Sequence, residues 1–110
     1  MSAIKGRNSD IISLELVVEF PAEASRIFSM LGDIAQWPGN LEPRVLKSKP
    51  HSKIIVGLPD FSRPEFSISP NKDGCEVVLL HDLIKSIDDR KEYRKIWKAW
   101  LKVLEKRVSQ

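Results

Sequence analysis

All seven prolines of this 110-residue chain fall between Pro21 and Pro70, and this feature limits most strongly how the chain can fold. A proline lacks a backbone N–H and cannot continue a helix interior or a central strand ladder. The middle of the chain can therefore hold only short segments. Residues 1–20 and 71–110 contain no proline, so both ends are free to form longer elements.

Residues 10–20 alternate between apolar and polar side chains. The apolar positions on one face are Ile12, Leu14, Leu16, Val18 and Phe20, and Ser13, Glu15 and Glu19 lie on the other. A period of two residues is typical of a strand with one buried side. The sequence predicts a strand from Asp10 to Phe20.

Two helices are expected after this strand. Pro21 suits the first turn of a helix, and helical spacing follows at Ala24, Ile27, Phe28 and Leu31. Gly32 is a natural helix stop. Asp33 can cap a second, short helix that runs to Trp37 and is ended by Pro38.

Short strands are expected over residues 44–49, 53–58 and 65–69, because proline or glycine bounds each segment. The dipeptide Asp73-Gly74 is common in hairpin turns. It leads into residues 75–83, which are rich in leucine and β-branched side chains. We expect this closing strand to pair with residues 10–20 in an antiparallel sheet.

The C-terminal segment predicts a long helix from Asp88 to Val108. No proline or glycine follows Ser86, which forms a capping-box-like start with Asp89. The apolar stripe of this helix comprises Tyr93, Ile96, Trp97, Trp100, Leu101, Leu104 and Val108. The opposite side carries Lys91, Lys95, Lys98, Lys102 and Lys106. Such a stripe must pack on something, and we expect it to lie across the concave face of the sheet.

Two stretches together resemble the START-like (SRPBCC) superfamily. The superfamily's opening strand and helical pair resemble Val17 to Gly39, VVEFPAEASRIFSMLGDIAQWPG. Its closing strand and C-terminal helix resemble Gly74 to Val108, which comprises GCEVVLLHDL and the helix that follows. The second stretch resembles heat-shock ATPase activator homologues and polyketide cyclase-like members, where a strand histidine like His81 precedes the helix.

The resemblance implies an α+β helix-grip fold. It consists of a short, curved antiparallel sheet of about five strands, a short helical pair after the first strand, and a long C-terminal helix across the sheet. Residues 40–83 have room for fewer strands than the family's usual set, so the grip is abbreviated. The family uses the space between helix and sheet for lipids, hormones, polyketides or a partner protein.

The chain length favours one domain. We expect a flexible N-terminus at residues 1–9 and a single START-like domain at residues 10–110. Residues 1–10 contain no apolar run typical of a secretory signal, and no segment has the roughly 20 apolar residues of a membrane span. Cys75 is the one cysteine, so no intrachain disulfide can form, and a cytoplasmic location is expected.

Catalytic and metal-binding patterns are missing from the sequence. It contains no GxGxxG or GxSxG motif, and Asp82 next to His81 on a strand would point to the opposite face. One cysteine and two histidines cannot fill a zinc site. We therefore assign no catalytic residue, metal or cofactor, and a non-catalytic role is favoured over an enzyme. Cys75 is interpreted as a core residue.

The net charge is only +3, so the lysine face of the last helix is interpreted as a solvated surface and nucleic acid is not an expected partner. An outer sheet patch of Ile11, Val17, Val78 and Leu80 suggests weak homodimerisation, with scattered surface apolar residues as the alternative.

Three functions stay open. The leading hypothesis is non-catalytic binding of a small hydrophobic ligand between the last helix and the sheet, oriented by His81 or an indole N–H. The expected lining is Phe28, Trp37, Val77, Leu79, His81, Trp97, Trp100, Leu101 and Leu104, with Phe28 and Trp37 near the mouth. The first alternative is a protein-interaction or regulatory domain of the activator type, with its groove filled by its own side chains. The second is a cyclase or lyase, which would need a perturbed acid–base group, and the sequence offers only His81.

Overall fold

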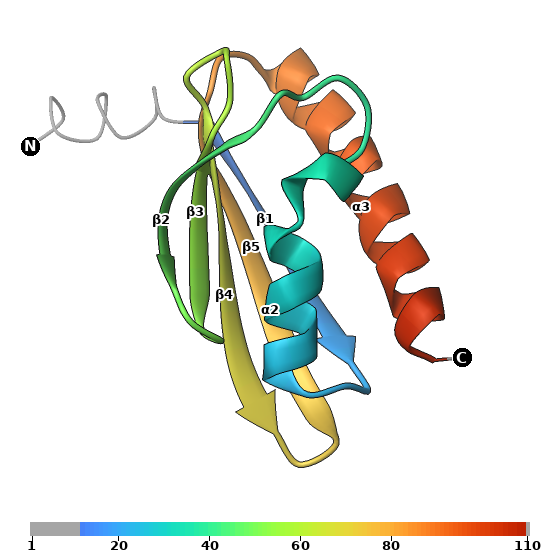
Figure 1. Ribbon diagram of the computed structural model, residues 1–110. Coiled ribbons are helices and arrows are strands. Elements are labelled where there is room, and N and C mark those ends of the chain that lie inside the picture. The colour runs from blue at the N-terminus through green and yellow to red at the C-terminus, as the bar shows by residue number, and fades with distance from the viewer. Residues whose placement is uncertain (1–11, 110) are drawn as a thin grey trace, which may run out of the picture.

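The computed structural model describes residues 12–109, in which five antiparallel strands form one sheet of order β1-β5-β4-β3-β2. The elements are β1 (Ile12–Phe20), α2 (Ala24–Gly32), the 3-10 turn η1 (Ile34–Gln36), β2 (Arg44–Lys49), β3 (Lys53–Gly57), β4 (Arg63–Asn71), β5 (Gly74–Ile84) and α3 (Ile87–Val108). Both helices lie on the same face of the sheet (Figure 1). The predicted α+β architecture with a long C-terminal helix is confirmed. The predicted flexible segment 1–9 and the first predicted strand residues, Asp10 and Ile11, lie outside the described residues.

β1 and β5 lie side by side, as the alternating patterns predicted. The antiparallel register places Val17 opposite Val78 and Phe20 opposite Cys75. Because residues of equal parity share a face, this pairing brings the apolar positions of both strands together toward the helices. The two strands therefore form the wall against which α3 packs.

Two prolines lie inside β4 rather than at its ends, so the predicted strand at residues 65–69 was too short. β4 is a central strand, and it contains Pro64 and Pro70. Ile68 has the same parity as these prolines, and its N–H donates to Ser52 on the β3 side. The missing N–H groups therefore point toward β3, whose register with β4 extends only over the residues opposite Glu65 to Ser67. The prolines thus cost no ladder hydrogen bond.

Gly74 begins β5 immediately after the Lys72-Asp73 turn. Its φ is +155°, and a Cβ there would lie 2.1 Å from the carbonyl oxygen of Phe20. Glycine is therefore required at the point where the hairpin meets the end of β1.

The two main helices begin differently from each other. Pro21 lies outside α2, which begins at Ala24 after an N-cap at Glu23, so the predicted first-turn role of the proline was wrong. The second short helix is a single 3-10 turn. In α3 the predicted cap is confirmed, because the backbone N–H of Asp89 donates to Ser86 Oγ at 3.0 Å. No helix among residues 12–109 is long and apolar enough to cross a membrane.

Candidate functional site

Four aromatic side chains fill the space between the sheet and α3. Trp37 follows η1, Phe66 lies on β4, and Trp97 and Trp100 lie one turn apart on α3. The Trp37 ring centroid is 5.3 Å from that of Trp97 and 5.6 Å from that of Phe66, in edge-to-face contacts. All four side chains are buried. This aromatic cluster (Trp37, Phe66, Trp97 and Trp100) occupies the place where the helix-grip resemblance implies a cavity.

The structure brings eight of the nine predicted lining residues together in the core. The buried ones are Trp37, Val77, Leu79, His81, Trp97, Trp100, Leu101 and Leu104. Phe28 is only half-buried. It packs against this core from the side and edge-on against His51, with ring centroids 5.6 Å apart. Trp37 lies within the aromatic cluster rather than near a mouth, and its indole N–H donates to the carbonyl of Leu31 at 2.8 Å.

His81 is fully buried and belongs to a chain of polar side chains that crosses the core. Trp97 Nε1 lies 3.0 Å from His81 Nδ1, and His81 Nε2 lies 2.8 Å from Ser62 Oγ. Ser62 Oγ lies 2.5 Å from Asp60 Oδ1, and the Tyr93 hydroxyl lies 2.5 Å from Asp60 Oδ2. Among the described residues no buried side-chain N or O atom lacks a partner.

The direction of every hydrogen bond in this polar chain follows from its two ends. An indole N–H can only donate, so His81 Nδ1 accepts and Nε2 carries the proton. Nε2–H then donates to Ser62 Oγ, and the serine hydroxyl donates to the Asp60 carboxylate. The serine hydroxyl thus donates its hydrogen bond to the aspartate and accepts one from the histidine, which is the reverse of a nucleophile activated by an imidazole base.

The protonation states agree with this arrangement. Burial lowers the pKa of His81 to about 4, and the nearby Asp60 carboxylate offsets only part of the effect. Burial would raise the pKa of Asp60, but hydrogen bonds from Ser62 and Tyr93 outweigh it and lower that pKa. Burial and the bond to Asp60 raise the pKa of Tyr93 to about 12. At neutral pH His81 is therefore neutral and Asp60 is ionised, and both nitrogens of His81 already have partners.

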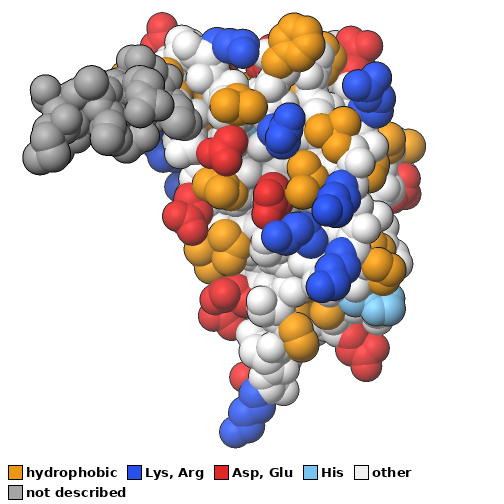
Figure 2. All heavy atoms as spheres, turned by 90° about the vertical axis from the view of Figure 1, so that its left-hand side faces the viewer, with side chains coloured by type: hydrophobic (Ala, Val, Ile, Leu, Met, Phe, Trp, Pro, Cys, Tyr) orange, Lys and Arg blue, Asp and Glu red, His pale blue; other side chains and the backbone are white. Residues whose placement is uncertain are grey.

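Three concavities are found away from the aromatic cluster. The first, of about 460 Å³, lies where β2, β3 and the loop 58–62 meet. The second, of about 430 Å³, lies between β1 and α3 and includes Leu101 in its wall. The third, of about 520 Å³, lies over β2, β3 and β4 beside Lys47, Lys49 and Lys53. Figure 2 shows basic side chains gathered among scattered hydrophobic ones on the side of the molecule that carries β2.

The outer sheet patch expected to support dimerisation is only partly exposed. Val17 is 56% exposed, whereas Val78 and Leu80 are half-buried. Ile11 lies outside the described residues.

Within residues 12–109 no group of three or more His, Cys, Asp or Glu side chains could hold a metal ion. Burial raises the pKa of the Cys75 thiol.

No protein-family model matches the sequence, and no curated protein is significantly similar to it. Solved structures share its fold. An AHSA1-like protein from Rhizobium etli superposes with a TM-score of 0.71 at 12% identity, over 86% of this chain and 80% of that one. A protein from Cytophaga hutchinsonii gives a TM-score of 0.70 at 14% identity, over 89% and 94% of the two chains.

The di-domain ARO/CYC StfQ from the steffimycin biosynthetic pathway also matches, with a TM-score of 0.69 at 12% identity. The match covers 96% of this chain and 54% of StfQ. At such identities the likeness shows the fold alone, and the helix-grip fold predicted from the sequence resemblance is confirmed.

Proposed function

We propose that this domain is a non-catalytic interaction or regulatory module that acts through its surface, with its groove filled by its own side chains. The observation that carries the proposal is the aromatic cluster. Trp97 is 0% exposed and contacts Trp37, Phe66 and Trp100 at centroid distances of 5.3 to 5.8 Å. A ligand between helix and sheet would have to displace these rings from well-packed positions.

The polar chain supports the non-catalytic part of the proposal. A general base must reach the proton that it removes, but both nitrogens of His81 are engaged with Trp97 and Ser62. Both residues beside the imidazole are themselves buried. The hydrogen bonds of the polar chain are therefore better explained as satisfying buried polar groups in the core than as preparing a residue to react with a substrate.

A ligand-binding experiment tests this function. Fatty acids and flat aromatic compounds would be titrated against the protein while its tryptophan fluorescence is recorded, and native mass spectrometry without detergent would search for a co-purified ligand. We expect neither saturable quenching by entry into the core nor a bound hydrophobic molecule. Saturable quenching that is weakened by Leu79→Trp, on the inner face of β5, but not by Val78→Trp, on its outer face, would contradict the proposal.

Hydrophobic ligand binding is a second candidate because of the concavity between β1 and α3. Leu16, Val18 and Leu101 give it apolar walls, and its charged lining residues are Lys98, Lys102 and Glu105. This combination suits a fatty acid, whose carboxylate could pair with a lysine while its chain lies on the apolar wall. Ala99→Trp would fill this space. Val103→Trp is the control, because Val103 lies on α3 outside the concavity. Laurate binding that only the first substitution weakens would support this candidate, and equal binding by both variants and the parent would remove it.

A further inference from the structure

Phe61 is the most exposed large apolar side chain among the described residues, at 80%. Its φ is +69°, a left-handed value that few residues other than glycine and asparagine adopt readily. Backbone strain of this kind persists only where the surrounding structure enforces it, and it is common at ligand sites. The exposed ring and the strained backbone at one position therefore need a common explanation.

The loop 58–62 is held rigidly around this residue. Its backbone closes on itself, because the N–H of Phe61 donates to the carbonyl of Leu58 at 2.9 Å and the N–H of Leu58 donates to the carbonyl of Ser62 at 3.0 Å. Asp60 accepts from the N–H of Ser62 at 2.9 Å and from the Tyr93 hydroxyl. Through Ser62 the loop is tied to the buried His81. The polar chain of the core thus fixes the loop that presents Phe61 to solvent.

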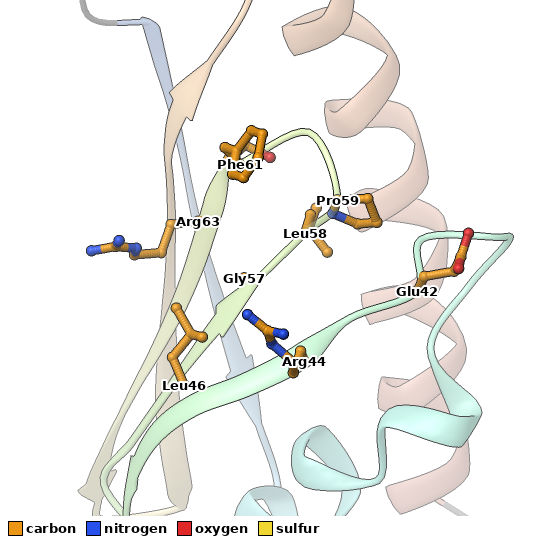
Figure 3. A pocket seen from close by; sticks show the side chains of 9 residues that line it. Glu42, Arg44, Leu46, Gly57, Leu58, Pro59, Phe61 and Arg63 are labelled. Atoms are coloured by element: carbon orange, nitrogen blue, oxygen red, sulfur yellow. The ribbon is translucent and has the colours of Figure 1, made fainter.

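The concavity of about 460 Å³ lies directly beside this ring, a volume within the range of small-molecule sites. Figure 3 shows Arg44 reaching from β2 toward Gly57, Phe61 on the loop above, and Arg63 pointing outward from β4. Gly57 allows the Leu46 side chain to lie close to the backbone of β3, since a Cβ there would lie 3.2 Å from it. The concavity therefore combines an apolar wall, an exposed aromatic ring and one inward cation, and the carboxylate of Glu42 also belongs to its lining.

Neither arginine of the concavity forms a salt bridge with a carboxylate in the described part of the chain. Lys53–Glu65 is the only salt bridge between residues 12 and 109, so no carboxylate in that range lies within 4.0 Å of a guanidinium nitrogen of Arg44 or Arg63. Lys85 Nζ lies 5.9 Å from the Phe61 ring centroid, which adds a third positive charge. The lining carries two arginines, Arg44 and Arg63, against one carboxylate, Glu42. Its net charge is therefore positive, which favours an anion.

We infer that this concavity binds a small organic anion with a flat apolar body, such as an aromatic carboxylate. The planar guanidinium of Arg44 matches a carboxylate in a two-bond pair. The flat body of the ligand stacks on Phe61 and covers the apolar wall near Leu58. Arg63 and Lys85 increase the positive potential at the entrance. This inference goes beyond the proposed function, because the concavity lies outside the filled core.

The test uses 2-naphthoate as the probe and its neutral amide, 2-naphthamide, as the matched ligand. Binding to the full chain would be followed by amide chemical shifts in two-dimensional NMR spectra. We expect saturable shifts in loop 58–62 and at the start of β2, with the amide binding about tenfold more weakly because it lacks the charge-assisted pair. Arg44→Gln should weaken naphthoate binding by a similar factor. Lys47→Gln, the same charge change on the same exposed strand, should not.

Phe61→Asn separates binding from folding. Asparagine tolerates a left-handed backbone, so urea unfolding should show unchanged or slightly raised stability while naphthoate binding is lost. The inference is overturned if naphthoate gives no saturable shift at millimolar concentration, or if Arg44→Gln and Lys47→Gln weaken it equally. It is also overturned if Leu79→Trp abolishes binding while Phe61→Asn does not, a result that would place the ligand in the core and contradict the proposed function too. Absence of naphthoate binding alone would leave the proposed function intact.

Discussion

Acidification should destabilise this domain through His81 at a higher pH than through Asp60. The imidazole has a pKa of about 4 in the folded chain, against 6.5 as the ordinary value. A group whose folded pKa is depressed contributes its stability above the unfolded pKa and loses it as the pH falls through the folded pKa. At about pH 5 the unfolded imidazole is almost fully protonated and the folded one mostly neutral, which corresponds to a loss of about 2 kcal/mol relative to pH 7.5. The complete loss, below about pH 4, is about 3 kcal/mol.

Urea unfolding followed by tryptophan fluorescence, at a series of pH values, measures this loss. The matched variant is His81→Gln, whose amide can accept from Trp97 and donate to Ser62 but does not titrate. Asp60 has a lowered pKa, so its contribution to the free energy of unfolding is lost at a lower pH than that of His81. His51 is present in both proteins. We expect the free energy of unfolding of the parent to fall about 2 kcal/mol more than that of the variant between about pH 7.5 and pH 5. Parallel plots of unfolding free energy against pH for the two proteins would refute a neutral imidazole with hydrogen bonds at both nitrogens.

Three further predictions follow from the core packing, the turn at Gly74 and the outer face of the sheet. Trp97→Ala should lower the free energy of unfolding by about 3 to 5 kcal/mol, whereas Lys98→Ala on the solvated side of α3 should change it by less than about 0.5 kcal/mol; equal urea midpoints would show that α3 is rotated. Gly74→Ala should cost at least about 2 kcal/mol, because its Cβ would meet the Phe20 carbonyl, and an unchanged midpoint would contradict the close approach. Weak self-association through the outer face around Val17 should appear in sedimentation at high micromolar concentration, and a monomer throughout would remove it.

The elements that the sequence predicted well are those whose pattern repeats along one segment. The alternation that ends at Phe20 and the apolar stripe that contains Trp97 each indicate one buried face. Each pattern lies within a single segment of the sequence. β4 was predicted too short because a proline is judged locally as a terminator. Only the register shows that Pro64 and Pro70 lie on the β3 side of the strand, outside the residues of β4 that pair with β3.

The polar chain could be predicted only in part. The sequence predicted His81 on the inner face of the closing strand, but not its partners. Ser62 and Trp97 are 19 and 16 residues away in sequence, and Asp60 accepts from Tyr93 across 33 residues. No periodicity links positions on a loop, a strand and a helix. For the same reason nothing in the sequence indicated that Phe61 faces solvent, since its exposure depends on how the loop closes onto β5 and α3.

The two edge strands of the shortened sheet carry unlike charges, and this bears on how copies of the chain meet at high concentration. β1, at one edge, carries Glu15 and Glu19, whereas β2, at the other, carries Arg44, Lys47 and Lys49. Charged edge strands discourage pairing between identical edges. Contact of a β2 edge with the β1 edge of another copy meets no such repulsion, and head-to-tail contacts of this kind lead to open-ended chains rather than closed dimers. Added salt screens that attraction, so concentrated stocks should stay dispersed better at moderate ionic strength than in dilute buffer.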